Sequence, residues 1–336
     1  MNFRELLHQL VAGEDLSEGD AAAIAGAIMD GKTTPAQTAA FLTALAAKGE
    51  TAAELIGTAR AMRERSVKVE HDLPLVADVV GSGGDGADTI NISTLAALVV
   101  AAAGVPVAKH GNRAASGQCG SADILEAGGM KLDVTPERAA GSLKELGFTF
   151  MFAPAYHPAM KNVAPVRREL GIRTIFNMVG PLTNPAQATH LLAGVARADH
   201  VEIVGEVLQA LGVRAAAVVN ASSGIDEIGG EGPTSVYEFG DGTVKRWTLN
   251  PQEFGVRASA AEIRGGPVAE CRTAFEAILA GERSPRSDVV ALNAALAFRL
   301  CGKTADIRDG MELARAQLYE GHAASLFARA AAYSHG

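Results

Sequence analysis

Hydrophobic residues recur at helical spacing through residues 1–70, with short connections between the segments. Recognisable capping residues stand at three of the predicted helix starts: Ser17, the pair Thr34-Pro35, and Thr51 with Glu54 in a capping box. Alanine and glycine along the helix faces favour close helix packing, for which a second copy of the chain is one candidate partner. No polar cluster here is typical of catalysis, so we expect a structural helical domain.

The hydrophobic period changes from helical to strand-like at Leu73 to Val80, and from there strands and helices alternate. Apolar runs predict further strands at 148–153, 191–195 and 215–219, and a peripheral hairpin at 236–249 that turns at 240–242. Helices are expected at 135–147, 200–211, 271–279, 287–300 and from 307 to the end. The predicted fold class is therefore α/β. A small all-helical domain at 1–72, joined by part of 160–185, accompanies a larger α/β domain at 73–336 with a mostly parallel central sheet.

Charge and cysteine content narrow the functional classes. Lys and Arg number 30 against 38 Asp and Glu, a formal net charge of -8, whereas nucleic-acid binding relies on a basic surface. Cys119, Cys271 and Cys301 are widely separated, which disfavours a disulfide framework or a zinc site and indicates a reducing compartment. We interpret these cysteines as small core or loop residues without chemistry.

No segment of the sequence is typical of a signal peptide or a membrane span. The N-terminal residues are amphipathic. The longest apolar run, Leu95 to Ala108, contains Gly104 and Pro106 and is too short to cross a bilayer. We therefore expect a cytoplasmic protein that uses neither a membrane nor nucleic acid as a partner.

A glycine-rich loop follows the first predicted strand and leads into a helix. Four glycines permit close approach and positive φ angles, so that successive N–H groups form an anion-binding nest: Gly81, Gly83, Gly84 and Gly86. Short side chains follow that can donate to phosphate oxygens and cap the next helix: Asn91, Ser93 and Thr94. Asp85 is itself anionic, so we expect it to brace the loop or to meet a sugar hydroxyl or a metal rather than phosphate.

A second polar loop follows the next predicted strand. It contributes Lys109, His110, Asn112, Arg113, Ser116 and Ser121. Neither loop has the spacing of a dinucleotide-binding fingerprint or of a P-loop. The informative feature is the pair of loops on consecutive strand–loop–helix units, which brings both to the carboxyl edge of a parallel sheet. Together they predict a site for a molecule with several phosphate oxygens and a sugar.

Acidic and basic side chains elsewhere complete this picture. Asp226 and Glu227 follow another apolar strand, and carboxylates beside phosphates require a cation between them, so the pair predicts Mg²⁺ with Ser93 as a further oxygen ligand. Of Arg167 and Arg168, one is a candidate clamp for a substrate carboxylate, although surface or interdomain ion pairs are the usual role of such arginines. His110 and His157 remain open between ordering a loop and acting as a base.

Several motifs resemble the anthranilate phosphoribosyltransferase family. They are G-S-G-G-D-G at 81–86, N-I-S-T at 91–94, K-H-G-N-R at 109–113, G-S-A-D at 120–123 and the long stretch 157–186. The resemblance covers nearly the full chain. It implies a helical domain on an α/β domain, a homodimer formed through the helical part, and Mg²⁺-dependent transfer of a phosphoribosyl group from phosphoribosyl pyrophosphate (PRPP) to the amino group of anthranilate in tryptophan biosynthesis.

The resemblance also implies roles for individual residues. PRPP would be contacted by Gly81, Gly84, Asp85, Thr89, Asn91, Ser93, Thr94, Lys109 and Ser121. The anthranilate site would be lined by Gly81, Asn112 and Arg167. The metal would be held by Ser93, Asp226 and Glu227. Departures from the family pattern include Gly117, where a serine is usual, Ser82 for a threonine, Asn220 to Ser223 before the acidic pair, Ala115 and Cys119. Gly117 implies that one phosphate donor is absent.

Two other functions remain as alternatives. A pyrimidine nucleoside phosphorylase resembles this family in fold and glycine loop, but needs a different phosphate and base signature that we do not find. A non-catalytic nucleic-acid-binding relative is disfavoured by the acidic net charge and by the intact Asp226-Glu227 pair. The sequence therefore favours the transferase.

Overall fold

The computed structural model describes residues 2–114 and 117–336, so Ser116 of the second loop lies outside the described residues. Four helices form the N-terminal end of the molecule: α1 (Phe3–Val11), α2 (Glu18–Met29), α3 (Pro35–Lys48) and α4 (Ala52–Glu64). The expected caps are confirmed, since Ser17 accepts a hydrogen bond from the Asp20 N–H and capping boxes form at Thr34 and Thr51.

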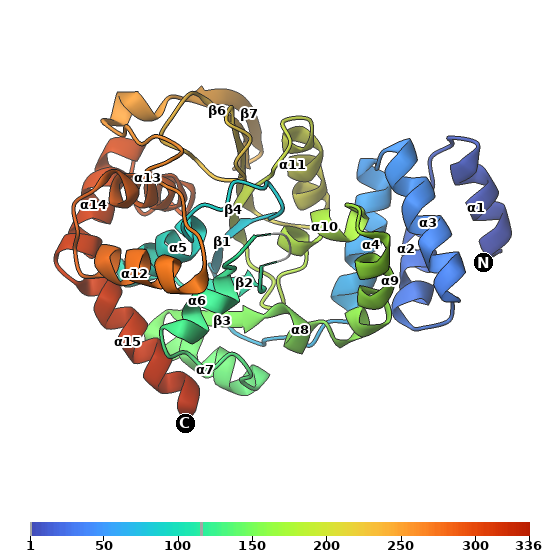
Figure 1. Ribbon diagram of the computed structural model, residues 1–336, viewed down its shortest axis with the longest axis horizontal. Coiled ribbons are helices and arrows are strands. Elements are labelled where there is room, and N and C mark those ends of the chain that lie inside the picture. The colour runs from blue at the N-terminus through green and yellow to red at the C-terminus, as the bar shows by residue number, and fades with distance from the viewer. Residues whose placement is uncertain (1, 115–116) are drawn as a thin grey trace.

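Helices α2 and α4 pack closely because Gly57 has no side chain. A Cβ at Gly57 would lie 2.3 Å from the Glu18 carbonyl oxygen, so any larger residue would push the two helices apart. The close packing that the small residues predict is, at Gly57, a contact between two helices of the same chain. Figure 1 shows the four helices gathered on the side of the molecule away from α12–α15.

Residues after the third strand of the chain return to these N-terminal helices. The segments are the 3-10 turn η1 (Pro158–Asn162), α9 (Ala164–Leu170) and α10 (Ile175–Met178), which contact α2, α3 and α4. Asn162 fixes one such contact by donating its amide to the Met29 carbonyl at 2.7 Å. A boundary at residue 72 and a dimerisation role for the helical part stay predictions.

A seven-stranded sheet with the order β3-β2-β1-β4-β5-β6-β7 forms the centre of the larger part. Its parallel strands are β1 (Ala77–Gly81), β2 (Val107–Gly111), β3 (Phe148–Phe152), β4 (His190–Gly194) and β5 (Ala215–Ala221). The hairpin of β6 (Thr234–Gly240) and β7 (Thr243–Leu249) adds two antiparallel strands at one edge. The predicted α/β class with a mostly parallel sheet is confirmed.

The sheet is buried on both faces, which explains its nearly continuous apolar strands. In β5, Ala217 and Val219 face one hydrophobic core while Ala216 and Val218 face another. The first core is covered by α5 (Ile92–Ala102), α6 (Ser121–Ala127), α12 (Val268–Leu279), α13 (Pro285–Leu300), α14 (Ile307–Tyr319) and α15 (His322–His335). The second includes α11 (His200–Ala210), part of α7 (Pro136–Leu146) and the N-terminal helices.

Several element boundaries differ from the sequence prediction, and two of these differences have a local physical cause. β1 begins at Ala77 rather than at residue 73, because Pro74 has no N–H for a sheet ladder. The helix expected from residue 307 to the end is broken into α14 and α15 at Gly321, whose φ of 77° favours glycine. No helix among residues 2–114 and 117–336 is both long and apolar enough to cross a membrane.

Candidate active site

Three loops meet at the carboxyl edge of the parallel strands. The loop after β1 carries the glycines, the loop after β2 carries the second polar motif, and the loop after β5 carries Asp226 and Glu227. Parallel strands end at the same edge of a sheet, which is where α/β proteins bind their ligands. Hydrogen bonds join the first and third loops directly, although about 140 residues separate them in sequence.

Asp226 lies against the first glycine loop. Its Oδ2 accepts a hydrogen bond from the Gly83 N–H and lies 3.5 Å from the Ser82 hydroxyl. A Cβ at Gly81 would approach that oxygen to 2.6 Å, so the absence of a side chain at Gly81 makes room for the carboxylate. Asp85 braces the same loop, which is one of the roles expected for it from the sequence. Its carboxylate accepts hydrogen bonds from the Ala87 N–H at 3.1 Å and from the Asp226 N–H at 3.3 Å.

Glu227 reaches the start of α5. Its Oε1 accepts from the Ser93 N–H at 2.9 Å, and the Thr89 hydroxyl donates to Oε2 at 3.4 Å. Lys109 completes the network from β2, since its Nζ donates to the Val79 carbonyl at 2.6 Å and to the Ser93 hydroxyl at 3.4 Å. Thr89, Ser93, Lys109 and Glu227 are therefore brought together as one polar cluster.

The acidic pair is buried, and this changes its protonation. Asp226 and Glu227 are only 7% and 8% exposed. Burial, reinforced by the neighbouring carboxylates, raises the pKa of Asp226 to about 7 and the pKa of Glu227 to about 8. Burial also lowers the pKa of Lys109, which is 1% exposed. Two buried acids side by side favour either protons or a cation.

The donor set fits a hard divalent cation that shares its coordination with a ligand. No group of three His, Cys, Asp or Glu side chains is arranged to hold a metal among the residues described. Mg²⁺ commonly takes only one or two protein carboxylates and completes its shell with phosphate oxygens and water. The carboxylates of Asp226 and Glu227, with the Ser93 hydroxyl nearby, match that requirement.

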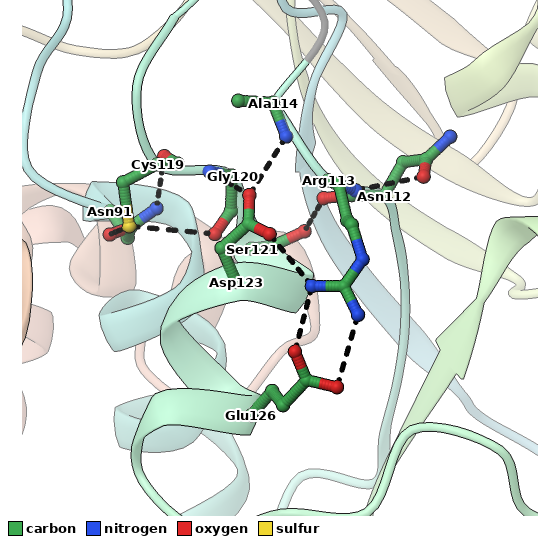
Figure 2. A network of polar contacts seen from close by, with 9 residues as sticks. All are labelled: Asn91, Asn112, Arg113, Ala114, Cys119, Gly120, Ser121, Asp123 and Glu126. Atoms are coloured by element: carbon green, nitrogen blue, oxygen red, sulfur yellow. Dashed lines mark hydrogen bonds and ion pairs between the residues drawn. The ribbon is translucent and has the colours of Figure 1, made fainter. Parts of the chain in front are cut away.

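The second loop forms its own network, drawn in Figure 2. Asn91 donates its side-chain amide to the Cys119 carbonyl at 3.1 Å, and the Ser121 hydroxyl donates to the Asn112 carbonyl at 3.2 Å. Asn91 occupies the N-cap position of α5 but makes no capping hydrogen bond with its side chain, so the predicted cap is wrong. Its amide instead joins the two polar loops.

Two residues of the predicted set have side chains that are either already paired or buried. Arg113 is held in ion pairs with Asp123 at 2.9 Å and Glu126 at 2.8 Å on the surface of α6 (Figure 2). Thr94 is 1% exposed, and its hydroxyl has no hydrogen-bond partner within the described part of the chain. A ligand contact by either side chain would require a rearrangement.

Arg167 lies on α9, apart from the polar loops. It is half-buried, and burial lowers its pKa. Its guanidinium makes no hydrogen bond or ion pair with residues 2–114 or 117–336, and so none with Gly81 or Asn112. The neighbouring Arg168 is exposed. An unpaired, partly desolvated guanidinium is a strong hydrogen-bond donor for an anionic ligand.

Arg173 links this segment to the glycine loop, and the sequence alone gave no sign of it. Its Nη1 donates to the Gly84 carbonyl at 2.7 Å. The two residues are far apart in the chain, and no local spacing relates them. The contact attaches the α9–α10 segment to the glycine loop that follows β1.

His110 and His157 form a buried pair whose ring centroids are 5.0 Å apart. Burial lowers the pKa of His110 to about 4 and the pKa of His157 to about 3, so both rings are neutral near pH 7. His110 Nδ1 lies 3.3 Å from the Gly180 carbonyl oxygen. The Gly180 contact favours the loop-ordering alternative for His110, whereas neither ring nitrogen of His157 has a hydrogen-bond partner among the described residues. The lowered pKa values make both rings weak bases.

Comparisons with known proteins match this chain from end to end. Residues 4–66 match the helical bundle domain, and residues 73–324 the a/b domain, of the glycosyl transferase family. Anthranilate phosphoribosyltransferase of Symbiobacterium thermophilum is 49% identical over 99% of this chain and 98% of its own. This chain belongs to the anthranilate phosphoribosyltransferase family.

Solved structures of the family have the same fold. The crystal structure of the enzyme from Thermus thermophilus superposes with a TM-score of 0.92 at 43% identity, covering 98% of this chain and 99% of that one. The enzyme from Saccharomyces cerevisiae, in complex with PRPP and Mg, has a TM-score of 0.90 at 25% identity, covering 99% and 98%. The helical part and the α/β part are thus both features of the family.

One departure from the family pattern has a structural setting here. A Cβ at Gly117 would lie 2.6 Å from Asp88 Oδ1, so a serine at this position would have to displace the Asp88 side chain. Asp88 itself has a φ of 47°, which few residues other than glycine adopt.

Proposed function

We propose that this protein transfers the phosphoribosyl group of PRPP to the amino group of anthranilate, giving N-(5-phosphoribosyl)anthranilate and pyrophosphate in L-tryptophan biosynthesis. The observation that carries the proposal is the contact of Asp226 with the glycine loop and of Glu227 with the start of α5, in a chain 49% identical to a curated enzyme of that activity. Carboxylates repel a phosphate bound beside them, and a Mg²⁺ ion between the two removes this repulsion.

PRPP would bind along the two loops after β1 and β2. Gly81 and Gly84 allow its phosphates to approach the backbone, and Lys109 supplies a buried positive charge beside Ser93. We assign the PRPP contacts to Gly81, Gly84, Asp85, Thr89, Asn91, Ser93, Thr94, Lys109 and Ser121.

Mg²⁺ would be held by Asp226, Glu227 and Ser93. When bound, it would neutralise phosphate charge as pyrophosphate departs. The yeast relative with PRPP and Mg supports this assignment. The protein's part is to keep both carboxylates in place through the Gly83 and Ser93 N–H groups.

Anthranilate would be bound by its carboxylate at Arg167, with Gly81 and Asn112 lining its site. The planar guanidinium matches a carboxylate in two parallel hydrogen bonds. The attacking amine is a neutral nucleophile, so no strong base is needed before attack. Positioning of the two substrates and stabilisation of charge on the leaving group are then the main sources of rate.

We also propose a homodimer formed through the helical residues 1–72, in the cytoplasm, without membrane or nucleic-acid partners. Cys119, Cys271 and Cys301 are free thiols, as is usual in a reducing compartment. Sedimentation equilibrium tests the dimer, and a monomer at micromolar concentration would refute it.

The decisive test is the loss of anthranilate fluorescence in the presence of purified protein. We expect the signal to fall only when PRPP and Mg²⁺ are both present, with pyrophosphate released in equal amount. No loss of anthranilate under these conditions would overturn the proposal. Phosphate-dependent release of a base from a pyrimidine nucleoside would instead favour the phosphorylase.

A further inference from the structure

Three successive N–H groups of the first glycine loop have no hydrogen-bond partner within the described part of the chain. They belong to Gly84, Asp85 and Gly86, whereas the N–H before them, on Gly83, donates to Asp226. Gly84 and Gly86 have φ angles of 72° and 75°. Such left-handed residues in a turn bring successive N–H groups to one concave side, where they can bind an anion. The three groups therefore form the anion nest that the sequence predicts.

Arg173 holds the carbonyl group that lies between two of these N–H groups. Its Nη1 donates to the Gly84 carbonyl oxygen at 2.7 Å. The peptide bond is planar and trans here, so the C=O of Gly84 and the N–H of Asp85 point in opposite directions. The Asp85 N–H is therefore directed away from Arg173. Because a glycine backbone is freer to rotate than that of any other residue, this orientation depends on the bond from Arg173.

Arg173 lies in a short connection between α9 and α10 that is fixed at both ends. Before it, α9 ends at Gly171, which has a φ of 63° and donates its N–H to the Arg167 carbonyl at 3.1 Å. After it, the Thr174 N–H donates to Asn177 Oδ1 at 2.9 Å in the capping box that begins α10. The guanidinium of Arg173 is therefore presented to the glycine loop from a rigid backbone.

The charge of Arg173 also suits an anion at this loop. The loop carries Asp85, whose carboxylate accepts the Asp226 N–H at 3.3 Å, so two acids lie close to the nest. Arg173 is exposed, and the Gly84 carbonyl is its one hydrogen-bond partner among residues 2–114 and 117–336. Its other N–H donors and its positive charge therefore remain available, and they offset the repulsion between these acids and an approaching phosphate.

We propose that Arg173 is a positioning residue for PRPP, which holds the Gly84 carbonyl so that the N–H groups of residues 84–86 are oriented for a phosphate before PRPP binds. The inference rests on the proposed function, because that function supplies PRPP as the ligand of this loop. A loop that is already ordered loses less conformational freedom on binding, and the affinity rises accordingly. Without Arg173 the peptide between Gly84 and Asp85 can rotate, and its carbonyl oxygen, which repels phosphate, can replace the N–H.

Binding of PRPP in the absence of anthranilate tests the proposal without turnover. Isothermal titration calorimetry of the full-length protein with PRPP and excess Mg²⁺ should give a Kd about tenfold higher for Arg173→Ala than for the wild type, the effect expected when one polar contact is lost. Arg173→Lys keeps a charged donor and should recover part of the affinity. Arg168→Ala removes the same charge from a nearby exposed position and should bind as the wild type does. Equal Kd values for the wild type and Arg173→Ala, or equal weakening in Arg168→Ala, would overturn the proposal.

Kinetics and stability separate positioning from a structural role. Arg173→Ala should raise the KM for PRPP about tenfold, change kcat by no more than about twofold, and leave the KM for anthranilate and the urea midpoint close to wild type. A lowered urea midpoint with similar changes in both KM values would assign Arg173 to the fold and refute the proposal. Binding of PRPP that depends on Arg173 in a protein that does not consume anthranilate would refute the proposed function and keep this inference. A wild type that does not bind PRPP would overturn both.

Discussion

Replacement of Arg167 by alanine should weaken use of anthranilate without weakening the fold. The guanidinium is half-buried, its pKa is lowered by burial, and it has no partner among the described residues. The desolvation of this charge has therefore already occurred in the free protein, and a bound carboxylate would compensate it. Loss of a charge-assisted hydrogen bond of ~1.5–3 kcal/mol corresponds to about one to two orders of magnitude in kcat/KM for anthranilate.

The Arg167→Ala variant should be as stable as the wild type or more stable, although its activity falls. A buried charge without a partner destabilises a folded protein, so its removal should leave the urea midpoint of Arg167→Ala unchanged or higher. Arg167→Lys should recover little activity, because a lysine cannot make the planar two-bond contact.

The assay is steady-state fluorescence of anthranilate at saturating PRPP and Mg²⁺. Arg168→Ala is the matched control, since it removes the same charge from the adjacent, exposed position. We expect the control to keep wild-type kinetics. Equal kinetics for Arg167→Ala and wild type would remove Arg167 from the anthranilate site, and a lowered urea midpoint would show that it stabilises the fold instead.

Two further predictions concern the glycine loop and the buried histidines. A Cβ at Gly81 would lie 2.6 Å from Asp226 Oδ2, well inside an ordinary contact of 3.4 Å, so Gly81→Ala should displace the carboxylate and raise the KM for PRPP by about tenfold. Gly19→Ala, with nothing closer than 3.9 Å, is the control, and equal KM values in both variants would contradict the prediction. In the folded protein the pKa values of His110 and His157 are lowered to about 4 and about 3. Below pH 6.5 the unfolded chain therefore binds more protons than the folded one. As the pH is lowered from 6.5, the free energy of unfolding should fall by up to about 1.4 kcal/mol per pH unit for each histidine. Urea unfolding at pH 7.5 and 5.5 measures this slope, and a variant with asparagine at both positions that keeps the wild-type slope would refute it.

Elements specified by local chemistry could be predicted from the sequence. The helix starts at Ser17, Thr34 and Thr51 follow from side chains that satisfy their own first turn. The hairpin turn at Asp241-Gly242 likewise follows from residues that tolerate positive φ, and both have it. Each signal lies within a few residues of the feature it specifies.

The arrangement of the site depends on contacts that no local pattern contains. The sequence indicated that the acidic pair and the glycine loop share a sheet edge, but not that the Gly83 and Ser93 N–H groups would bind those acids. The contact from Arg173 to the Gly84 carbonyl was not foreseen either. Such contacts depend on how separate loops pack, which the spacing along one chain does not record.

The cysteines and Asn91 show the same limit. The spacing of the cysteines could not reveal that the Cys119 sulfur would lie 3.6 Å from Asn91 Oδ1. Asn91 stands where a helix cap is expected, but its amide binds Cys119 from the second loop. A tertiary partner replaced the local one.

The central claim is that Asp226 and Glu227 hold Mg²⁺ against PRPP. The most direct test is turnover as a function of Mg²⁺ in the wild type and in the double variant Asp226→Asn/Glu227→Gln. Amides resemble the protonated acids, which the raised pKa values already favour, so the variant should keep the wild-type circular dichroism spectrum and urea midpoint. We expect Mg²⁺-dependent turnover in the wild type and its loss or severe reduction in the folded variant. Full activity in that variant, with an unchanged response to Mg²⁺, would show that the metal is held elsewhere.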